Sequence, residues 1–355
     1  MRYIDWQIDR FGEGADRPAV IWHDQIFSYA DLRAAYDGWV ERLAGDGVRA
    51  GDAVGVVGDF SPSSIACLLA LLKLRCIAVP LAWDSRDQHA TFCEIAELDW
   101  LVTLDADDAA TVAPQSFRRG HELMEKLREL DEPGLVLFSS GSTGKPKAIL
   151  HNLQPLLDKF RKPRHSMRTV SFLLFDHIGG FNTLLYTLAN LGTVVVPRDR
   201  SVAQVCDAVQ KHRAQLLPTS PSFLNLLLLG EAHRNYDLSS LELVTYGTEV
   251  MPERTLVMLG EALPNARLQQ TYGLSELGIL RSKSASNQSL LVKVGGEDYE
   301  TRVVDGTLHI RARSSMLGYL NAPSPFDADG WFNTGDAVIQ EGEYYRILGR
   351  KSEII

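Results

Sequence analysis

The chain has 355 residues, which is enough for one large or two medium domains. Hydrophobic residues make up 45% of it, so it can bury a sizeable core, and its formal net charge of −9 at pH 7 argues against a nucleic-acid partner held by phosphate contacts. The four cysteines have neither metal-ligand spacing nor the density of a disulfide framework, and they favour a reducing compartment.

Two stretches bear on the location of the protein. Residues 1–10 include Arg2, Asp5, Asp9 and Arg10 and have no apolar core, so they do not resemble a signal peptide. Residues 65–83 are apolar, but Lys73 and Arg75 interrupt them, which favours a helix followed by a strand over a membrane span. We therefore expect a cytoplasmic protein without a membrane span.

The first part of the chain predicts helices alternating with strands. Ser28 is placed to cap a helix, and residues 53–57 are typical of a buried strand. Ser61 followed by Pro62 is a strong helix start, and residues 76–80 form the next predicted strand. This is a strand–helix–strand unit, for which a right-handed crossover is expected.

The loop at residues 139–147 follows a short apolar run that reads as a strand. It consists of Ser139, Ser140, Gly141, Ser142, Thr143, Gly144, Lys145, Pro146 and Lys147. Small and hydroxylated residues offer many backbone N–H groups at little steric cost, and the two lysines add positive charge, so the loop suits phosphate oxygens. It is not a Walker loop, because Ser139 and Pro146 stand where that motif needs Gly and Ser or Thr.

The middle of the chain continues the alternating pattern. Residues 169–175 read as a strand, 181–190 as a helix, 241–246 as a strand and 252–262 as a helix. Such alternation predicts parallel-type sheets flanked by helices, arranged in two subdomains.

From about residue 281 short strands alternate with turns. Asp305-Gly306 is a hairpin signal between two of these strands. We expect an α/β body at 1–280, a small antiparallel β-barrel subdomain at 281–348 and a hinge segment at 349–355.

Several segments together resemble the adenylate-forming superfamily, which includes acyl- and aryl-CoA ligases, luciferases and amino-acid adenylation domains. The 139–147 loop is similar to the phosphate loop of that family, with Ala148 where Gly is usual. Residues 271–276 resemble its Tyr-Gly-x-Thr-Glu segment, with Ser275 in the place of Thr. Residues 331–336 resemble Trp-x-x-Thr-Gly-Asp, and residues 349–353 the Gly-Arg hinge segment, with Ser352 at the usual pivot position.

The resemblance implies a site for ATP or AMP. Beyond the phosphate loop, it implies nucleotide contacts from Gly247, Thr248, Glu249, Thr271, Tyr272, Gly273, Ser275, Asp336 and Arg350. Tyr272 would stack on adenine, Ser275 would contact the α-phosphate, and Asp336 would accept from both ribose hydroxyls. Glu276 and Thr143 would hold Mg²⁺. A plain turn is nearly as good an interpretation of residues 246–249.

The resemblance also implies a site for the acid. The residues expected there are His177, Asp176, Phe181, Leu185, Thr248 and Gly278, and the catalytic residues expected are His177, Lys147 and Glu276. Two alternatives stay open, because His177 could be a core histidine and the apolar helix face could be ordinary core. In amino-acid adenylation domains a Phe-Asp pair at this place anchors the substrate's amino group, whereas Asp-His-Ile-Gly-Gly looks more like a carboxylic acid ligase.

The function implied is that of an AMP-forming acid–thiol ligase. It would activate a small carboxylic acid with ATP and transfer the acyl group to CoA or to a phosphopantetheine carrier protein. The alternatives are an amino-acid adenylation domain and a nucleotide-binding module without turnover. Family members continue into a small C-terminal domain with a catalytic lysine, and since this sequence stops at Ile355, the 355-residue chain alone is expected to be impaired.

Overall fold

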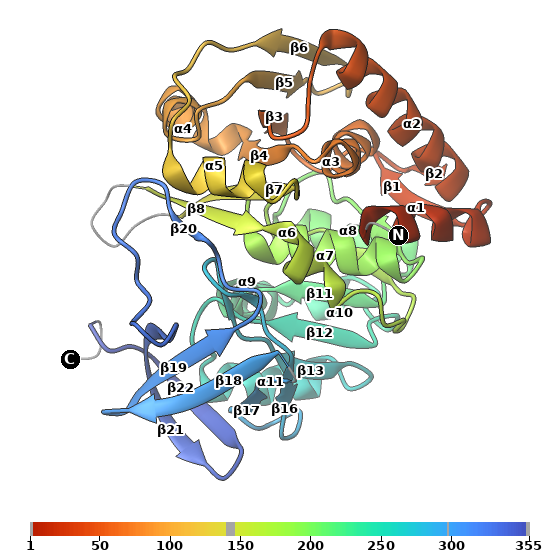
Figure 1. Cartoon of the computed structure of the whole chain (residues 1–355). Helices are drawn as coiled ribbons and strands as arrows, with labels where there is room; N and C mark the ends of the chain where they lie inside the picture. The colour runs from red at the N-terminus through yellow and green to blue at the C-terminus, as the bar shows by residue number, and fades with distance from the viewer. Residues whose placement is uncertain (1–2, 140–145, 297, 353–355) are drawn as a thin grey trace. The chain divides into compact units, whose positions relative to one another are not determined.

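The computed structural model describes residues 3–139, 146–296 and 298–352 (Figure 1). It divides into two compact units. Unit 1 comprises residues 1–166, 174–196 and 316–324, and unit 2 comprises 167–173, 197–315 and 325–355. The two units are described separately.

Unit 1 contains a seven-stranded sheet in the order β20-β8-β7-β4-β3-β5-β6. Its strands are β3 (Ala53–Gly58), β4 (Ile77–Ala82), β5 (Trp100–Leu104), β6 (Ala110–Pro114), β7 (Gly134–Ser139), β8 (Lys147–Asn152) and β20 (Gly318–Tyr319). The central strands β5, β3, β4 and β7 are parallel, whereas β6, β8 and β20 pair antiparallel with their neighbours. Unit 1 also contains β1 (Pro18–Trp22), β2 (Gln25–Ser28) and β10 (Thr193–Val195). β1 pairs antiparallel with β2 and parallel with β10.

The helices of unit 1 start where the sequence offers caps. They are α1 (Tyr3–Phe11), α2 (Tyr29–Asp46), α3 (Pro62–Leu74), α4 (His89–Ile95), α5 (Glu122–Glu129), α6 (Leu153–Asp158) and α7 (Ile178–Ala189), with the 3-10 helices η1 (Gly12–Gly14) and η2 (Trp83–Gln88). Ser28 and Ser61 each cap a helix, as predicted, and both also form a capping box. Gly47 ends α2 with a φ of 101°.

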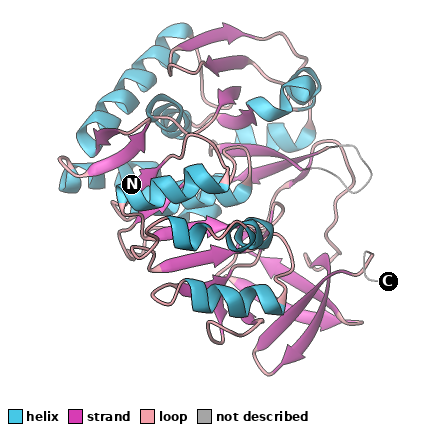
Figure 2. Ribbon diagram, turned by 180° about the vertical axis from the view of Figure 1, so that it is seen from behind, coloured by secondary structure: helices cyan, strands magenta, loops and turns pink. Residues whose placement is uncertain are grey.

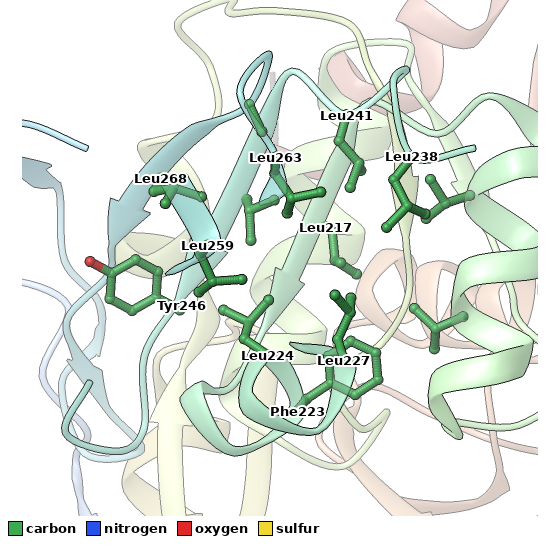
Figure 3. Close-up of a cluster of buried hydrophobic side chains, with 14 of the residues drawn as sticks. Leu217, Phe223, Leu224, Leu227, Leu238, Leu241, Tyr246, Leu259, Leu263 and Leu268 are labelled. Atoms are coloured by element: carbon green, nitrogen blue, oxygen red, sulfur yellow. The ribbon is translucent and has the colours of Figure 1, made fainter. Parts of the chain in front are cut away.

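Unit 2 begins with four parallel strands in the order β13-β12-β11-β9. The elements are β9 (Arg168–Val170), α8 (Val202–His212), β11 (Leu216–Thr219), α9 (Pro221–Leu229), α10 (Ala232–Asn235), β12 (Leu243–Tyr246), α11 (Glu253–Ala262) and β13 (Arg267–Gln270). Leu217 of β11, Leu224 of α9 and Leu259 of α11 belong to one buried cluster between these strands and helices (Figure 3).

The rest of unit 2 is made of strands. A six-stranded antiparallel sheet has the order β16-β17-β22-β21-β19-β18 and contains β16 (Ser282–Ser284), β17 (Leu291–Val294), β18 (Tyr299–Val304), β19 (Thr307–Ala312), β21 (Phe332–Glu341) and β22 (Tyr344–Arg350). The short pair β14 (Gly273–Leu274) and β15 (Gly278–Ile279) precedes it. These strands appear in magenta in Figure 2, and no helix interrupts the described residues after α11. Asp305-Gly306 joins β18 to β19, which confirms the predicted hairpin.

Two predicted boundaries were wrong. The strand expected at 169–175 is the three-residue β9, and the helix expected at 181–190 starts at Ile178. The helix starts early because His177 caps it, and histidine is not among the residues that normally signal a cap. Within the described parts of the chain, no helix is both long and apolar enough to cross a bilayer.

Candidate functional site

In unit 1 the parallel strands β3, β4 and β7 lead to one edge of the sheet. They end at Gly58, Ala82 and Ser139, and ligands of α/β sheets bind beyond the carboxyl ends of such strands. The predicted phosphate loop joins β7 to β8. The pair nearest to the loop is Ser139 of β7 with Lys147 of β8. The other predicted loop residues, from Ser140 to Lys145, lie outside the described residues.

Lys147 is the loop lysine that the structure describes. It is half-buried at the start of β8. Its ammonium nitrogen lies 4.9 Å from the centroid of the Tyr319 ring, a distance typical of a cation–π contact. The loop therefore ends in a positive charge held close to an aromatic face.

His177 lies in the same unit, at the N-terminus of α7. The backbone N–H of Gly179 donates to its Nδ1 at 3.2 Å. Burial lowers the pKa of His177, so the imidazole is neutral near pH 7. Because Nδ1 accepts, the single ring proton sits on Nε2, which is the atom that can donate to a ligand.

The Asp176 carboxylate accepts a hydrogen bond from the protein backbone. The N–H of Ala82, the last residue of β4, donates to its Oδ2 at 3.1 Å. Burial raises the pKa of Asp176, and the Ala82 contact opposes that shift. Phe175 packs edge-on against Phe60, with ring centroids 5.6 Å apart. Phe175 thus contacts Phe60 just after β3, and Asp176 contacts Ala82 at the end of β4.

Phe181 and Leu185 are both 2% exposed on α7. Such burial fits ordinary core, the alternative that the sequence left open for this helix face, and the role of Phe181 and Leu185 in the acid site stays a prediction. Gly278 lies in unit 2, where it pairs with Leu274 in the β14–β15 hairpin and has a φ of 79°.

In unit 2 three predicted nucleotide residues form one cluster. The Tyr272 hydroxyl donates to Asp336 Oδ2 at 2.5 Å, and Arg350 Nε lies 3.3 Å from Asp336 Oδ1. Arg350 also donates to the Thr334 carbonyl, and Thr334 Oγ1 accepts from the Asp336 N–H at 3.0 Å. Burial, followed by the charge of Asp336, raises the pKa of Tyr272 well above its ordinary value, so the phenol stays a neutral donor.

The ring of Tyr272 is 7% exposed and packs in the core of the β-sheet region with Leu277, Val292 and Leu308. The sequence placed Tyr272 and Asp336 in one site but did not predict the hydrogen bond between them. Residues 64 positions apart leave no local signal for such a contact.

Residues 247–249 and 271–273 follow neighbouring strands, because Tyr246 of β12 pairs with Gln270 of β13. A Cβ on Gly247 would lie 2.7 Å from Thr271 Oγ1 and 2.9 Å from the Thr271 carbonyl oxygen, so only glycine fits there. Thr248 has a φ of 70°. The Glu249 carboxylate accepts from the Ser222 N–H at 3.1 Å, at the start of α9.

Ser275 and Glu276 lie in the turn between β14 and β15, and both are half-buried. Carboxylate oxygens are donors that Mg²⁺ prefers, so Glu276 fits the predicted metal role chemically. Its predicted partner Thr143 lies outside the described residues.

Lowering the pH should reduce the stability that depends on His177. The pKa of His177 in the folded state lies below the ordinary value of about 6.5. When the pH is lowered below about 6.5, His177 is therefore protonated more readily in the unfolded chain than in the folded one. The free energy of unfolding then decreases as the pH decreases. Asparagine keeps an oxygen to cap α7 but does not titrate. The melting temperature of the wild type should therefore drop relative to His177→Asn between about pH 7 and pH 5. A constant difference would contradict the assignment of a neutral His177.

Comparison with known proteins shows the family and the fold of the chain. Residues 9–320 match the family described as AMP-binding enzyme. The chain is 27% identical to indoleacetate–CoA ligase of Aromatoleum aromaticum, over 100% of this chain and 79% of that protein. It is 27% identical to 4-coumarate–CoA ligase 1 of Oryza sativa, over 72% of this chain and 50% of that protein. The anthranilate CoA ligase AuaEII, solved with anthranoyl-AMP, has a similar structure with a TM-score of 0.82 at 19% identity, over 100% of this chain and 78% of that one.

The chain belongs to the AMP-binding enzyme family, since the match covers most of its length. The predicted resemblance to adenylate-forming enzymes is confirmed, and so is the α/β fold with an appended antiparallel sheet. The predicted enzyme class, an acid–thiol ligase, is that of the CoA ligases to which the chain is similar.

Proposed function

We propose that this chain activates a small carboxylic acid with ATP and that the acyl group then passes to the thiol of CoA. The observation that carries the proposal is the cluster of Tyr272, Asp336 and Arg350. A carboxylate offers about four acceptor positions, of which Tyr272 and Arg350 occupy one each. Two positions remain for the two ribose hydroxyls of a nucleotide.

The first step joins the acid to AMP. A carboxylate oxygen attacks the α-phosphorus of ATP, and the bond from that phosphorus to the pyrophosphate oxygen breaks. In the second step the thiol sulfur attacks the acyl carbon, AMP leaves, and the thiol proton goes to solvent. The protein contributes mainly position and charge to such a transfer.

The roles proposed in the first step follow from chemistry. Lys147 and the loop hydroxyls would offset phosphate charge, Ser275 would contact the α-phosphate, and His177 Nε2–H would donate to an oxygen of the acid. Glu276, together with Thr143, would hold Mg²⁺, which neutralises phosphate charge when bound.

The environment of Asp176 favours a carboxylic acid over an amino acid as substrate. An amine anchor needs an ionised carboxylate, whereas burial of Asp176 raises its pKa and so disfavours the charged form. The relatives named above are ligases of indoleacetate and 4-coumarate, and neither name denotes an amino acid. We therefore propose that the substrate is a carboxylic acid without an α-amino group.

Acid-dependent exchange of labelled pyrophosphate into ATP tests the proposal. Aryl and short acyl acids should support exchange, whereas amino acids should not. Exchange with amino acids alone would favour the adenylation-domain alternative. Binding of ATP without exchange for any acid would favour a nucleotide-binding module without turnover.

Asp176→Asn provides a sharper test of the substrate class. Asparagine keeps an oxygen that can accept from Ala82, so the KM for the acid should change by less than about 3-fold, the effect of a neutral-for-charged acceptor swap. Asp176→Leu loses the acceptor and should lower both the melting temperature and the exchange rate. If Asp176→Asn instead abolished exchange while the melting temperature stayed unchanged, the carboxylate would be a substrate anchor.

A further inference from the structure

We infer that residues 317–321 hold the stem of the 139–147 loop in place, with Asn321 and Tyr319 as positioning residues for Lys147. The inference rests on the proposed role of Lys147 toward the phosphates of ATP. It concerns residues of unit 1 only, and all the contacts that carry it lie in the described part of that unit.

The backbone of this segment extends the sheet beside the loop. Gly318 pairs with Leu150 and Tyr319 with Ile149 in the antiparallel β20–β8 pair. The Leu320 N–H then donates to the Ala148 carbonyl at 2.9 Å. Backbone pairing therefore reaches the residue next to Lys147.

Asn321 continues this pairing with its side chain. Its Oδ1 accepts from the Ala148 N–H at 2.9 Å, and its Nδ2 donates to the Pro146 carbonyl at 2.8 Å. The two contacts bracket Lys147 on both sides along the chain. An amide suits these two contacts, because it combines a neutral acceptor with an N–H donor, whereas a carboxylate would face the Pro146 carbonyl without a proton.

Tyr319 acts on the lysine side chain itself. The Lys147 ammonium lies 4.9 Å from the ring centroid, and Tyr319 is 7% exposed, so the ring is fixed by its surroundings. The negative face of a fixed ring attracts the ammonium and restricts where it can lie. Backbone and side chain of Lys147 are thus both constrained by one five-residue segment.

The segment is itself anchored on its far side. The carbonyl of Leu320 lies 2.8 Å from His121 Nε2, at the cap of α5. A Cβ on Gly318 would lie 2.7 Å from Leu123 Cδ1, so the backbone sits directly against α5. The segment connects the loop stem to a helix, and a rigid support is what a phosphate-binding lysine requires.

The test compares binding of ATP with binding of adenosine by titration calorimetry. Adenosine lacks phosphates, so it reports the nucleoside contacts without Lys147. Tyr319→Leu and Asn321→Asp should each weaken ATP binding roughly 5- to 20-fold, the range of a lost cation–π contact or of one lost hydrogen bond near a charge, and leave adenosine affinity within about 2-fold. Tyr319→Phe keeps the ring and should restore ATP affinity.

Lys162→Ala is the control, because it removes an exposed lysine of the same unit, and it should change neither affinity. His121→Ala removes the contact to Leu320 and the α5 cap, so it should lower the melting temperature and weaken ATP binding less than Tyr319→Leu does, with adenosine affinity unchanged. Equal loss of ATP and adenosine affinity in Tyr319→Leu and Asn321→Asp would mean a general structural role and would overturn the inference, as would folded variants with unchanged ATP affinity.

The outcome is separable from that of the proposed function. If the wild type binds ATP but supports no pyrophosphate exchange with any acid, the proposed reaction is wrong while the binding ratios still decide the inference. If the wild type binds adenosine and ATP equally well, Lys147 has no phosphate role, and the inference fails with it.

Discussion

Replacing Asp336 by alanine should weaken AMP binding at least roughly 100-fold, which is about 2.7 kcal/mol and close to the lower bound of about 3 kcal/mol for two hydrogen bonds to a charged group. The carboxylate is proposed to accept from both ribose hydroxyls, and alanine removes both contacts. Asp336→Asn keeps one acceptor oxygen and should lose less, roughly 10-fold. Titration calorimetry with AMP measures both variants.

The same substitution should also reduce stability. Alanine at 336 leaves the buried Tyr272 hydroxyl without its acceptor, and an unsatisfied buried group costs about 1–3 kcal/mol. Changing Tyr272 to phenylalanine as well removes that hydroxyl. The double variant Tyr272→Phe/Asp336→Ala should therefore regain melting temperature without regaining AMP affinity.

Asp329→Asn is the control, because Asp329 is an exposed carboxylate in the same unit. Its AMP affinity should equal that of the wild type. Asp336→Ala with wild-type AMP affinity would remove Asp336 from the nucleotide site. Recovery of affinity in the double variant would show that the single variant acted through misfolding.

Local chemistry made parts of this fold predictable from sequence. Ser28 and Ser61 cap helices through contacts to residues three positions away, so the signal lies within one turn. Asp305-Gly306 likewise specifies its hairpin alone. The strand expected at 169–175 was too long because residues 172–175 are apolar for a tertiary reason: Phe175 packs on Phe60, more than a hundred positions earlier.

The candidate site likewise contains residues that the sequence predicted and contacts that it did not. Tyr272, Asp336 and Arg350 were found because each lies in a short segment that resembles the family, and the structure places them in contact. The contacts of Asn321 and Asp176 are of another kind. Asn321 accepts from Ala148 across 173 positions, and Asp176 accepts from Ala82 across 94. In both cases the partner is a backbone N–H group, which is the same whatever the residue type and therefore leaves no pattern in the sequence. These contacts are therefore seen only in the folded structure.

Replacing Lys147 by alanine should lower acid-dependent pyrophosphate exchange roughly 100- to 1,000-fold, the cost of removing one group that stabilises transition-state charge. The ammonium is proposed to offset charge on the ATP phosphates during formation of the acyl-adenylate. Stability should change little, because Lys147 is half-buried at the first residue of β8. Lys147→Arg keeps the charge and the aromatic contact but alters the geometry, so it should retain part of the activity.

The second half-reaction separates this role from a general defect. A preformed acyl-adenylate has no β- or γ-phosphate, so its transfer to CoA should change by less than about 3-fold in Lys147→Ala if the lysine acts mainly on the departing pyrophosphate. Lys162→Ala removes an exposed lysine of the same unit and should leave both half-reactions unchanged. Equal losses in the two half-reactions of Lys147→Ala would instead place Lys147 at the adenylate or at the loop's structural support, because only a contact present in both steps can affect both.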